Sequence, residues 1–213
     1  MIQIKVFVFN PFQENTYILH DDTKECIIID PGCYTKQEES ELSTYISDNQ
    51  LNPVAIINTH THIDHILGNN FIFRTFNLKP IIHDAGTIFL SNASDYAAMF
   101  GIQVADMVMP EKFIDEGDKI SFGKSTLEVL YTPGHADGSV CLVNHEQSFV
   151  ITGDVLFNGS IGRTDLLTGD FDILTESITQ KLYSLPDNYI VYPGHGETTT
   201  IGNEKLSNPF IRG

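Results

Sequence analysis

Seven histidine and aspartate side chains stand where they could hold metal ions. Four of them fall within residues 58–65, which read NTHTHIDH and directly follow an apolar run. His60 and His62 are two residues apart, so extended backbone directs both side chains to the same side. Asp64 and His65 come next, where the chain would be entering a turn or a helix. One such segment could therefore serve two metal ions.

Three further candidate ligands each follow an apolar run. His135 and His195 end Thr-Pro-Gly-His and Tyr-Pro-Gly-His segments, and Asp154 ends a Thr-Gly-Asp segment. Loops at strand ends often carry catalytic groups, and glycine there permits close approach of the backbone. Five histidines and two aspartates are enough for two metal ions with one shared carboxylate, which leaves positions open for water and substrate. This ligand set suits zinc, and iron or manganese also accept it.

The seven candidates differ from the other histidines in their setting. Unpaired buried carboxylates beside imidazoles are costly unless a metal ion satisfies them, which disfavours a merely structural role for the set. His20 and His145 lie in predicted hairpin turns and His83 follows a predicted strand, so we expect surface or structural roles for these three.

Nine apolar or alternating runs predict β-strands. They are Ile4–Phe9, Thr16–Leu19, Cys26–Ile29, Val54–Ile57, Pro80–Ile82, Thr126–Leu130, Val140–Val143, Phe149–Thr152 and Tyr189–Tyr192. Helices are predicted over 35–50, over 65–76, over 85–100 and from an N-cap at Asp170 to Pro186. The last has an apolar face made of Phe171, Leu174, Ile178, Leu182 and Leu185. This order predicts a mixed α/β protein with much hairpin-connected sheet rather than a doubly wound parallel sheet.

Composition excludes several classes of protein. The 213 residues fit one domain, over 1–213, and neither a repeat nor a linker divides them. With 28 acidic and 12 basic residues, the net charge of −16 would repel nucleic acid and an anionic membrane surface. No signal peptide is evident, and no apolar run approaches the ~20 residues of a membrane helix.

The three cysteines show no C-x-x-C spacing and do not build a disulfide framework, which indicates a reducing compartment, with the cytoplasm expected. Cys26 and Cys141 lie in apolar strands and are expected in the core. For Cys33, which follows a strand end, a structural role is expected, with approach to the site as the alternative.

The H-x-H-x-D-H signature at residues 60–65, followed in order by His135, Asp154 and His195, resembles that of the metallo-β-lactamase-fold hydrolases. Residues 153–165 and 200–210 are similar to the short bacterial glyoxalase II-like group within them. The resemblance spans nearly the whole chain. It implies an αββα sandwich, with two mixed β-sheets flanked by helices and the site at one edge.

The resemblance also implies roles for the residues. His60, His62 and His135 would hold one metal ion, Asp64, His65 and His195 a second, and Asp154 would bridge them. Two divalent ions, zinc first, would make the chain a hydrolase of thioesters such as S-lactoylglutathione, because the thiolate is a good leaving group. Asp64 would orient the attacking water and shuttle its proton.

Two departures limit the transfer of substrate. Full-length glyoxalase II enzymes carry a C-terminal helical region that contributes glutathione contacts, and this chain stops shortly after His195. Arg163 could instead bind a substrate carboxylate bidentately, or it could form a salt bridge to Asp165 or Asp170.

Other activities of the superfamily stay open. Persulfide dioxygenases share the Gly-Arg-Thr-Asp stretch at 162–165 but use a single iron to oxidise a glutathione persulfide. Hydrolysis of another ester, a lactone or a β-lactam is also compatible with the ligand set. Metal content would separate the dioxygenase from the hydrolases.

Overall fold

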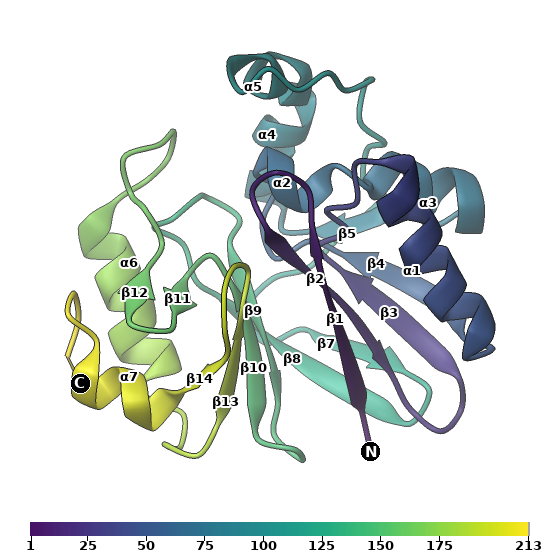
Figure 1. The fold of residues 1–213 in the computed structure, drawn as a ribbon. Helices are drawn as coiled ribbons and strands as arrows, with labels where there is room; N and C mark the ends of the chain where they lie inside the picture. Colours follow the sequence, from purple (N-terminus) through teal and green to yellow (C-terminus); the bar gives the residue numbers. More distant parts are fainter. Residues whose placement is uncertain (213) are drawn as a thin grey trace.

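The computed structural model describes residues 1–212 and places two six-stranded sheets face to face (Figure 1). The first sheet has the strand order β1-β2-β3-β4-β5-β6. Its strands are β1 (Gln3–Phe9), β2 (Glu14–His20), β3 (Glu25–Ile29), β4 (Asn52–Ile57), β5 (Pro80–Ile82) and β6 (Lys112–Phe113). The pairs from β1 to β3 are antiparallel and those from β3 to β6 are parallel, so the sheet is mixed.

The second sheet has the order β14-β13-β10-β9-β8-β7. Its strands are β7 (Lys119–Phe122), β8 (Ser125–Tyr131), β9 (Val140–Asn144), β10 (Phe149–Gly153), β13 (Ile190–Pro193) and β14 (Thr199–Thr200). All pairs are antiparallel except β10 with β13, which are parallel. A small hairpin of β11 (Leu156–Phe157) and β12 (Ser160–Ile161) follows β10.

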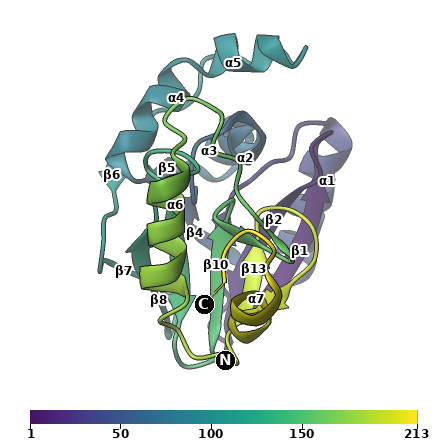
Figure 2. The same ribbon diagram turned by 90° about the vertical axis from the view of Figure 1, so that its left-hand side faces the viewer.

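Helices cover the outer faces of both sheets. On the first sheet lie α1 (Lys36–Asp48) and α3 (Asn69–Phe76); on the second lie α6 (Phe171–Ser177), the π-helical segment η2 (Ile178–Leu182) and α7 (Ile201–Ser207). Figure 2 looks onto the second outer face, with α6 in the foreground. The four layers confirm the predicted αββα sandwich of two mixed sheets.

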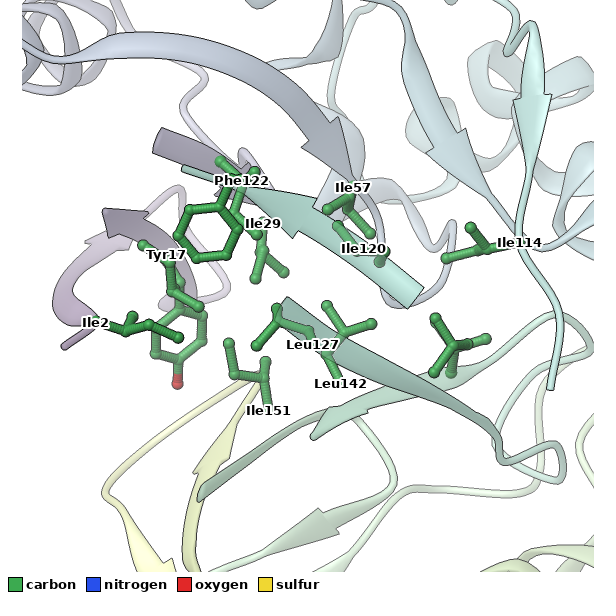
Figure 3. Packing of buried hydrophobic residues seen from close by; sticks show 14 of the residues in the cluster. Ile2, Tyr17, Ile29, Ile57, Ile114, Ile120, Phe122, Leu127, Leu142 and Ile151 are labelled. Carbon is green, nitrogen blue, oxygen red and sulfur yellow. The ribbon is translucent and has the colours of Figure 1, made fainter. Parts of the chain in front are cut away.

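The central core lies between the sheets. Tyr17, Ile29 and Ile57 of the first sheet pack in one cluster with Leu142 and Ile151 of the second (Figure 3). The strands β2, β9 and β10 are buried along their whole length because a sheet covers one face and helices cover the other. Such double burial explains why β9 and β10 are near-continuous apolar runs, whereas β2 also buries the polar residues Glu14, Asn15 and Thr16.

Two of the predicted helices form where their capping residues stand. Thr35 caps α1 in a capping box with Glu38, and Asp170 caps α6 by accepting hydrogen bonds from the N–H groups of Asp172 and Ile173. Leu174, Ile178, Leu182 and Leu185 pack onto the second sheet as expected. Phe171 is 48% exposed, so its assignment to the buried face was wrong and that face begins at Leu174.

The other two predicted helices are divided. Residues 65–76 form α2 (Ile63–Ile66) and α3, separated near Gly68, whose N–H donates to the Pro31 carbonyl at 2.7 Å. A Cβ at Gly68 would meet that carbonyl oxygen and the Cys33 Sγ, both at 2.6 Å. Residues 85–100 form the 3-10 turn η1 (Asp84–Gly86), α4 (Thr87–Ser91) and α5 (Ala93–Met99). Tertiary contact, which local periodicity does not reveal, sets the first break.

Several short elements were not predicted. The strands β6, β7, β11, β12 and β14 and the helix α7 fall outside the nine runs and four helices. In β7, buried Ile120 and Phe122 alternate with exposed Lys119 and Ser121, which is an ordinary half-buried strand pattern. Among residues 1–212, no helix is both long and apolar enough to cross a bilayer.

Asp21 joins the two sheets at one end. It lies in the turn after β2, where its carboxylate accepts hydrogen bonds from the N–H of Lys124 at 2.7 Å and the hydroxyl of Ser125 at 2.8 Å, both at the β7–β8 turn. Thr23 adds bonds from its N–H and its hydroxyl. Burial alone would raise the pKa of Asp21, but these hydrogen bonds hold it well below its usual value.

We predict that Asp21→Asn lowers the free energy of unfolding by about 1–3 kcal/mol at pH 7, because charge-assisted hydrogen bonds are lost. Since the folded-state pKa is lowered, this stabilisation is present above the unfolded pKa of ~4 and is lost as the pH falls below it. Urea unfolding at pH 7 and at pH 3 measures both effects. Asp22→Asn, at an exposed neighbour, is the control, and equal effects of the two variants at pH 7 would contradict the prediction.

Candidate metal centre

The H-x-H-x-D-H segment spans the junction between β4 and α2. His62 is the N-cap of α2 in extended conformation, with φ −64° and ψ 154°, and His60 lies in the bend that follows β4. Asp64 and His65 lie in the first turn of the helix. The side-chain amide of Asn58 donates to the His65 carbonyl at 2.8 Å and fixes this bend. The change of backbone conformation thus gives the four donors two directions, as the spacing predicts.

The structure brings all seven predicted donors together. One triad, His60, His62 and His135, has one donor atom from each residue within 4.8 Å of the others. A second triad, Asp64, His65 and His195, meets the same limit.

Asp154 lies between the two triads. Its Oδ2 is 3.7 Å from His135 Nε2 and 3.6 Å from His195 Nε2, and its Oδ1 is 3.3 Å from His65 Nε2. One carboxylate therefore faces both groups of donors, which is the arrangement that a shared ligand requires.

Most of these donor atoms are buried and have no hydrogen-bond partner. They are the Nε2 atoms of His60, His62, His65 and His135 and the Oδ1 atom of Asp154. Buried polar atoms are nearly always paired in folded proteins, and each unpaired one costs free energy. Since imidazole nitrogen and carboxylate oxygen are common ligands of divalent transition metals, the donor set fits such ions.

In three of these histidines, the other ring nitrogen, Nδ1, has a hydrogen-bond partner. Nδ1 of His65 lies 3.1 Å from an Asp30 carboxylate oxygen, Nδ1 of His135 lies 2.8 Å from the Arg163 carbonyl and Nδ1 of His195 lies 3.1 Å from the Phe12 carbonyl. An acceptor at Nδ1 places the ring proton there and leaves Nε2 as the free donor atom. The Asp30 carboxylate and two backbone carbonyls thereby set the orientation of the three rings.

Asp30 is a functional residue that the sequence interpretation missed. It could form a metal-binding group with His60 and His65, but its carboxylate already accepts bonds from the N–H of Thr59 at 2.7 Å and the Thr59 hydroxyl at 2.6 Å, besides contacting His65. We therefore assign it to positioning His65. The sequence does contain a signal for Asp30. This residue follows an apolar run and is followed by Pro-Gly, and the same Pro-Gly pair stands between an apolar run and the ligands His135 and His195.

Glycine allows the close approach of backbone to these donors. A Cβ on Gly194 would lie 2.2 Å from Asp154 Oδ1 and 2.8 Å from His65 Cε1. At Gly134, with φ of +119°, a Cβ would lie 2.2 Å from the Leu174 nitrogen. Gly134 directly precedes His135, and Gly194 directly precedes His195. A side chain at either glycine would displace that histidine.

The ionised carboxylates of the site attract positive charge. Burial lowers the pKa of His62 to about 3 and that of His60 well below its usual value, so both rings are neutral at pH 7. Burial alone would raise the pKa of Asp64 and Asp154, but the neighbouring His65 lowers both, so both carboxylates are ionised. Burial opposes a charge on His65 as well, yet Asp64 and Asp154 raise its pKa well above the usual value. The pocket therefore favours positive charge.

A cavity of about 620 Å³ opens over the donors. Its floor includes His62, Asp64, His135, Asp154 and His195. Arg163 also lines it, and its guanidinium makes a bidentate ion pair with Asp165, with N–O distances of 2.7 and 2.8 Å. The salt bridge allowed by the sequence is present, while substrate binding by Arg163 stays a prediction.

The other histidines contact aromatic residues instead. His145 Nδ1 lies 2.8 Å from the Tyr189 hydroxyl, and the His83 ring stacks on Tyr131 at 4.2 Å. His20 is the buried last residue of β2 rather than part of a turn, and its Nε2 lies 3.2 Å from the Tyr45 hydroxyl.

Each of the three cysteines is buried and unbonded to another cysteine. Cys26 and Cys33 belong to the core between the first sheet and its helices, and Cys141 belongs to the core under α6. Of the two expectations for Cys33, the structure places it in the core.

Residues 9–195 match the family model described as the metallo-beta-lactamase superfamily. The chain belongs to this superfamily. A relative named hydroxyacylglutathione hydrolase GloC, from Haemophilus influenzae, is 36% identical over 212 residues, covering 99% of this chain and 98% of that protein. A probable metallo-hydrolase, YqgX from Bacillus subtilis, is 38% identical over 206 residues, covering 95% and 94%. This superfamily member is accordingly a metal-dependent hydrolase.

Solved structures of the superfamily superpose closely. BLEG-1, described as a B3 metallo-beta-lactamase, gives a TM-score of 0.87 at 36% identity over 99% of this chain and 100% of that one. TTHA1623 in a di-iron-bound form gives 0.87 at 33% identity over 97% and 100%. ETHE1 from Myxococcus xanthus gives 0.78 at 27% identity over 97% and 83%. These neighbours agree on the fold and differ in what their names say of metal and activity.

We predict that Asp30→Asn weakens the affinity for Zn²⁺ about 10- to 100-fold while leaving the fold intact, because the ring of His65 loses its charged partner. Competition with a chromophoric chelator measures the affinity, and far-UV circular dichroism monitors the fold. Asp48→Asn, an exposed carboxylate at the end of α1, is the matched control. An affinity equal to that of the control would show that Asp30 does not support the site.

Proposed function

We propose that this chain hydrolyses acyl thioesters of the S-lactoylglutathione type with two divalent metal ions, zinc first. The observation that carries the proposal is the pair of donor triads with Asp154 between them. His60, His62 and His135 would hold one ion, Asp64, His65 and His195 the other, and Asp154 both. When bound, such ions lower the pKa of water to about 7 and polarise a carbonyl oxygen.

The chain itself supplies a base at the cavity. Asp64 lines the cavity, and its Oδ2 lies 3.1 Å from His195 Nε2 and 3.6 Å from His65 Nε2. Because its pKa is lowered, the carboxylate is ionised and can orient the attacking water and take its proton. The two imidazoles hold it at the floor of the cavity.

A thioester is the acyl compound that this equipment suits best. The thiolate is a good leaving group and needs less protonation on departure than an amide nitrogen. One relative is named a hydroxyacylglutathione hydrolase, which supports the same reaction class. Asp165 accepts hydrogen bonds from Nε and one terminal nitrogen of Arg163, so it occupies one edge of the guanidinium that could bind a substrate carboxylate.

A second candidate is the oxidation of a persulfide at a single iron. The Gly-Arg-Thr-Asp stretch at 162–165, shared with persulfide dioxygenases, favours it. A set of seven donors that includes a central carboxylate exceeds what one ion uses, which favours the hydrolase.

The first test is metal analysis of protein purified without chelators, paired with loss of the thioester absorbance of S-lactoylglutathione. We expect about two ions per chain and thioester cleavage that a chelator abolishes and Zn²⁺ restores. A single iron per chain, with oxygen uptake on glutathione persulfide and no thioester cleavage, would move the protein to the dioxygenase class.

We predict that Asp64→Asn lowers kcat for thioester hydrolysis by about 10²- to 10⁴-fold, because the amide cannot take a proton from water. One ion, at the triad of His60, His62 and His135, should remain bound and be detectable by metal analysis. Asp48→Asn again serves as the control. Unchanged turnover in Asp64→Asn would remove Asp64 from the reaction.

A further inference from the structure

One wall of the cavity is built from aromatic side chains of the α4–α5 arm, which lies above α2 (Figure 1). Phe89 packs edge-on against the ring of His62, with centroids 5.0 Å apart, and lies 5.8 Å from Tyr96. Phe100 packs edge-on against Phe12 of the β1–β2 turn at 5.4 Å. The apolar wall therefore begins at a donor residue and continues outward to the mouth of the cavity.

A second wall, formed by the loop after β12, carries two apolar side chains beside the Arg163–Asp165 ion pair. Leu166 and Leu167, in the loop after Arg163, line the cavity and are 37% and 49% exposed. Met99 and Phe100 on the first wall are 78% and 51% exposed. Exposed apolar side chains gathered on both walls of a cavity are typical of a surface that a ligand covers.

Beyond its floor, the cavity has few cationic groups that could bind an anionic ligand. Among the cavity-lining residues of the described chain, 1–212, Arg163 is the one Lys or Arg, and Asp165 neutralises it through two hydrogen bonds. The chain as a whole carries a net charge of −16. Glutathione has two carboxylates and one ammonium group, so its arm would meet apolar walls and a guanidinium that is already paired.

We propose that the cavity selects thioesters with an uncharged, apolar arm on the acyl or the thiol side over S-lactoylglutathione. This inference rests on the proposed thioesterase function and names the substrate class of the same site. The arm would extend from the scissile carbonyl at the floor and lie between the aromatic wall and the two leucines. Burial of each methylene then contributes about fourfold to binding.

Two series of substrates separate the acyl arm from the thiol arm. The first varies the acyl group from acetyl to hexanoyl on the neutral thiol N-acetylcysteamine. The second places a lactoyl group on glutathione, N-acetylcysteamine and phenylmethanethiol. We expect kcat/KM to rise about three- to fourfold per methylene in the first series, or at least tenfold from glutathione to phenylmethanethiol in the second. A flat first series together with a preference for the glutathione ester would overturn the inference.

A matched pair of variants tests the wall. Phe100→Gln should lower kcat/KM about five- to tenfold for the favoured apolar thioester and less than twofold for S-acetyl-N-acetylcysteamine. Phe210→Gln is the control, because Phe210 is 57% exposed and lies outside the cavity lining. Equal losses on both substrates, or equal losses in both variants, would show that the wall does not contact the arm.

The Asp165→Asn variant tests whether the ion pair with Asp165 keeps Arg163 from binding an anionic substrate. Release of Arg163 should raise kcat/KM for S-lactoylglutathione about two- to fivefold relative to the neutral thioesters, as expected for an exposed ion pair. An unchanged ratio would overturn the part assigned to Asp165.

The experiments distinguish a failure of the proposed thioesterase function from a failure of the proposed apolar selection. If the wild-type protein, loaded with Zn²⁺, cleaves none of these thioesters, the proposed function is wrong. If it cleaves S-lactoylglutathione at least as well as every apolar thioester, the proposed function stands and the apolar selection is wrong.

Discussion

The burial of polar donor atoms without hydrogen-bond partners is the constraint on which the rest of this structure depends. The Nε2 atoms of four histidines and one oxygen of Asp154 converge below the cavity, where each would be costly if nothing satisfied it. A protein tolerates such a concentration only if a cation repays it and the backbone holds the donors in place. Many hydrogen bonds near the site hold the donors in place.

Backbone bonds between the two sheets meet this requirement next to the donors. The N–H of Asn15 donates to the Gly194 carbonyl at 2.7 Å, and the N–H of Val140 donates to the Thr59 carbonyl at 2.8 Å. The Tyr17 hydroxyl adds a bond to the Pro193 carbonyl at 2.6 Å. Each of these groups lies beside a donor or its support. The two sheets are thus joined directly by hydrogen bonds next to the site.

The donors were readable from sequence because their signals are local: four of them stand within residues 60–65, and His135 and His195 each follow a Pro-Gly turn. Their convergence follows the resemblance to a known family, not spacing. Asp30 was missed because a lone aspartate before Pro-Gly also suits an ordinary turn, and only the folded chain brings it to His65. The break at Gly68 depends on contact with Pro31, which lies far away in sequence.

The parallel pairing of β10 with β13 has a consequence for the folding of the chain. Asp154 follows β10, whereas His195 follows β13, and the crossover through α6 separates them. The donors around His60 and the donor His195 are therefore far apart in the chain. The entropy of closing the long loop between them must be overcome before His195 can join the site. The centre is complete only when the two ends of this long loop have met. An ion held there then acts as a cross-link between the first and last thirds of the molecule, so its loss loosens the joint between the sheets rather than a single loop.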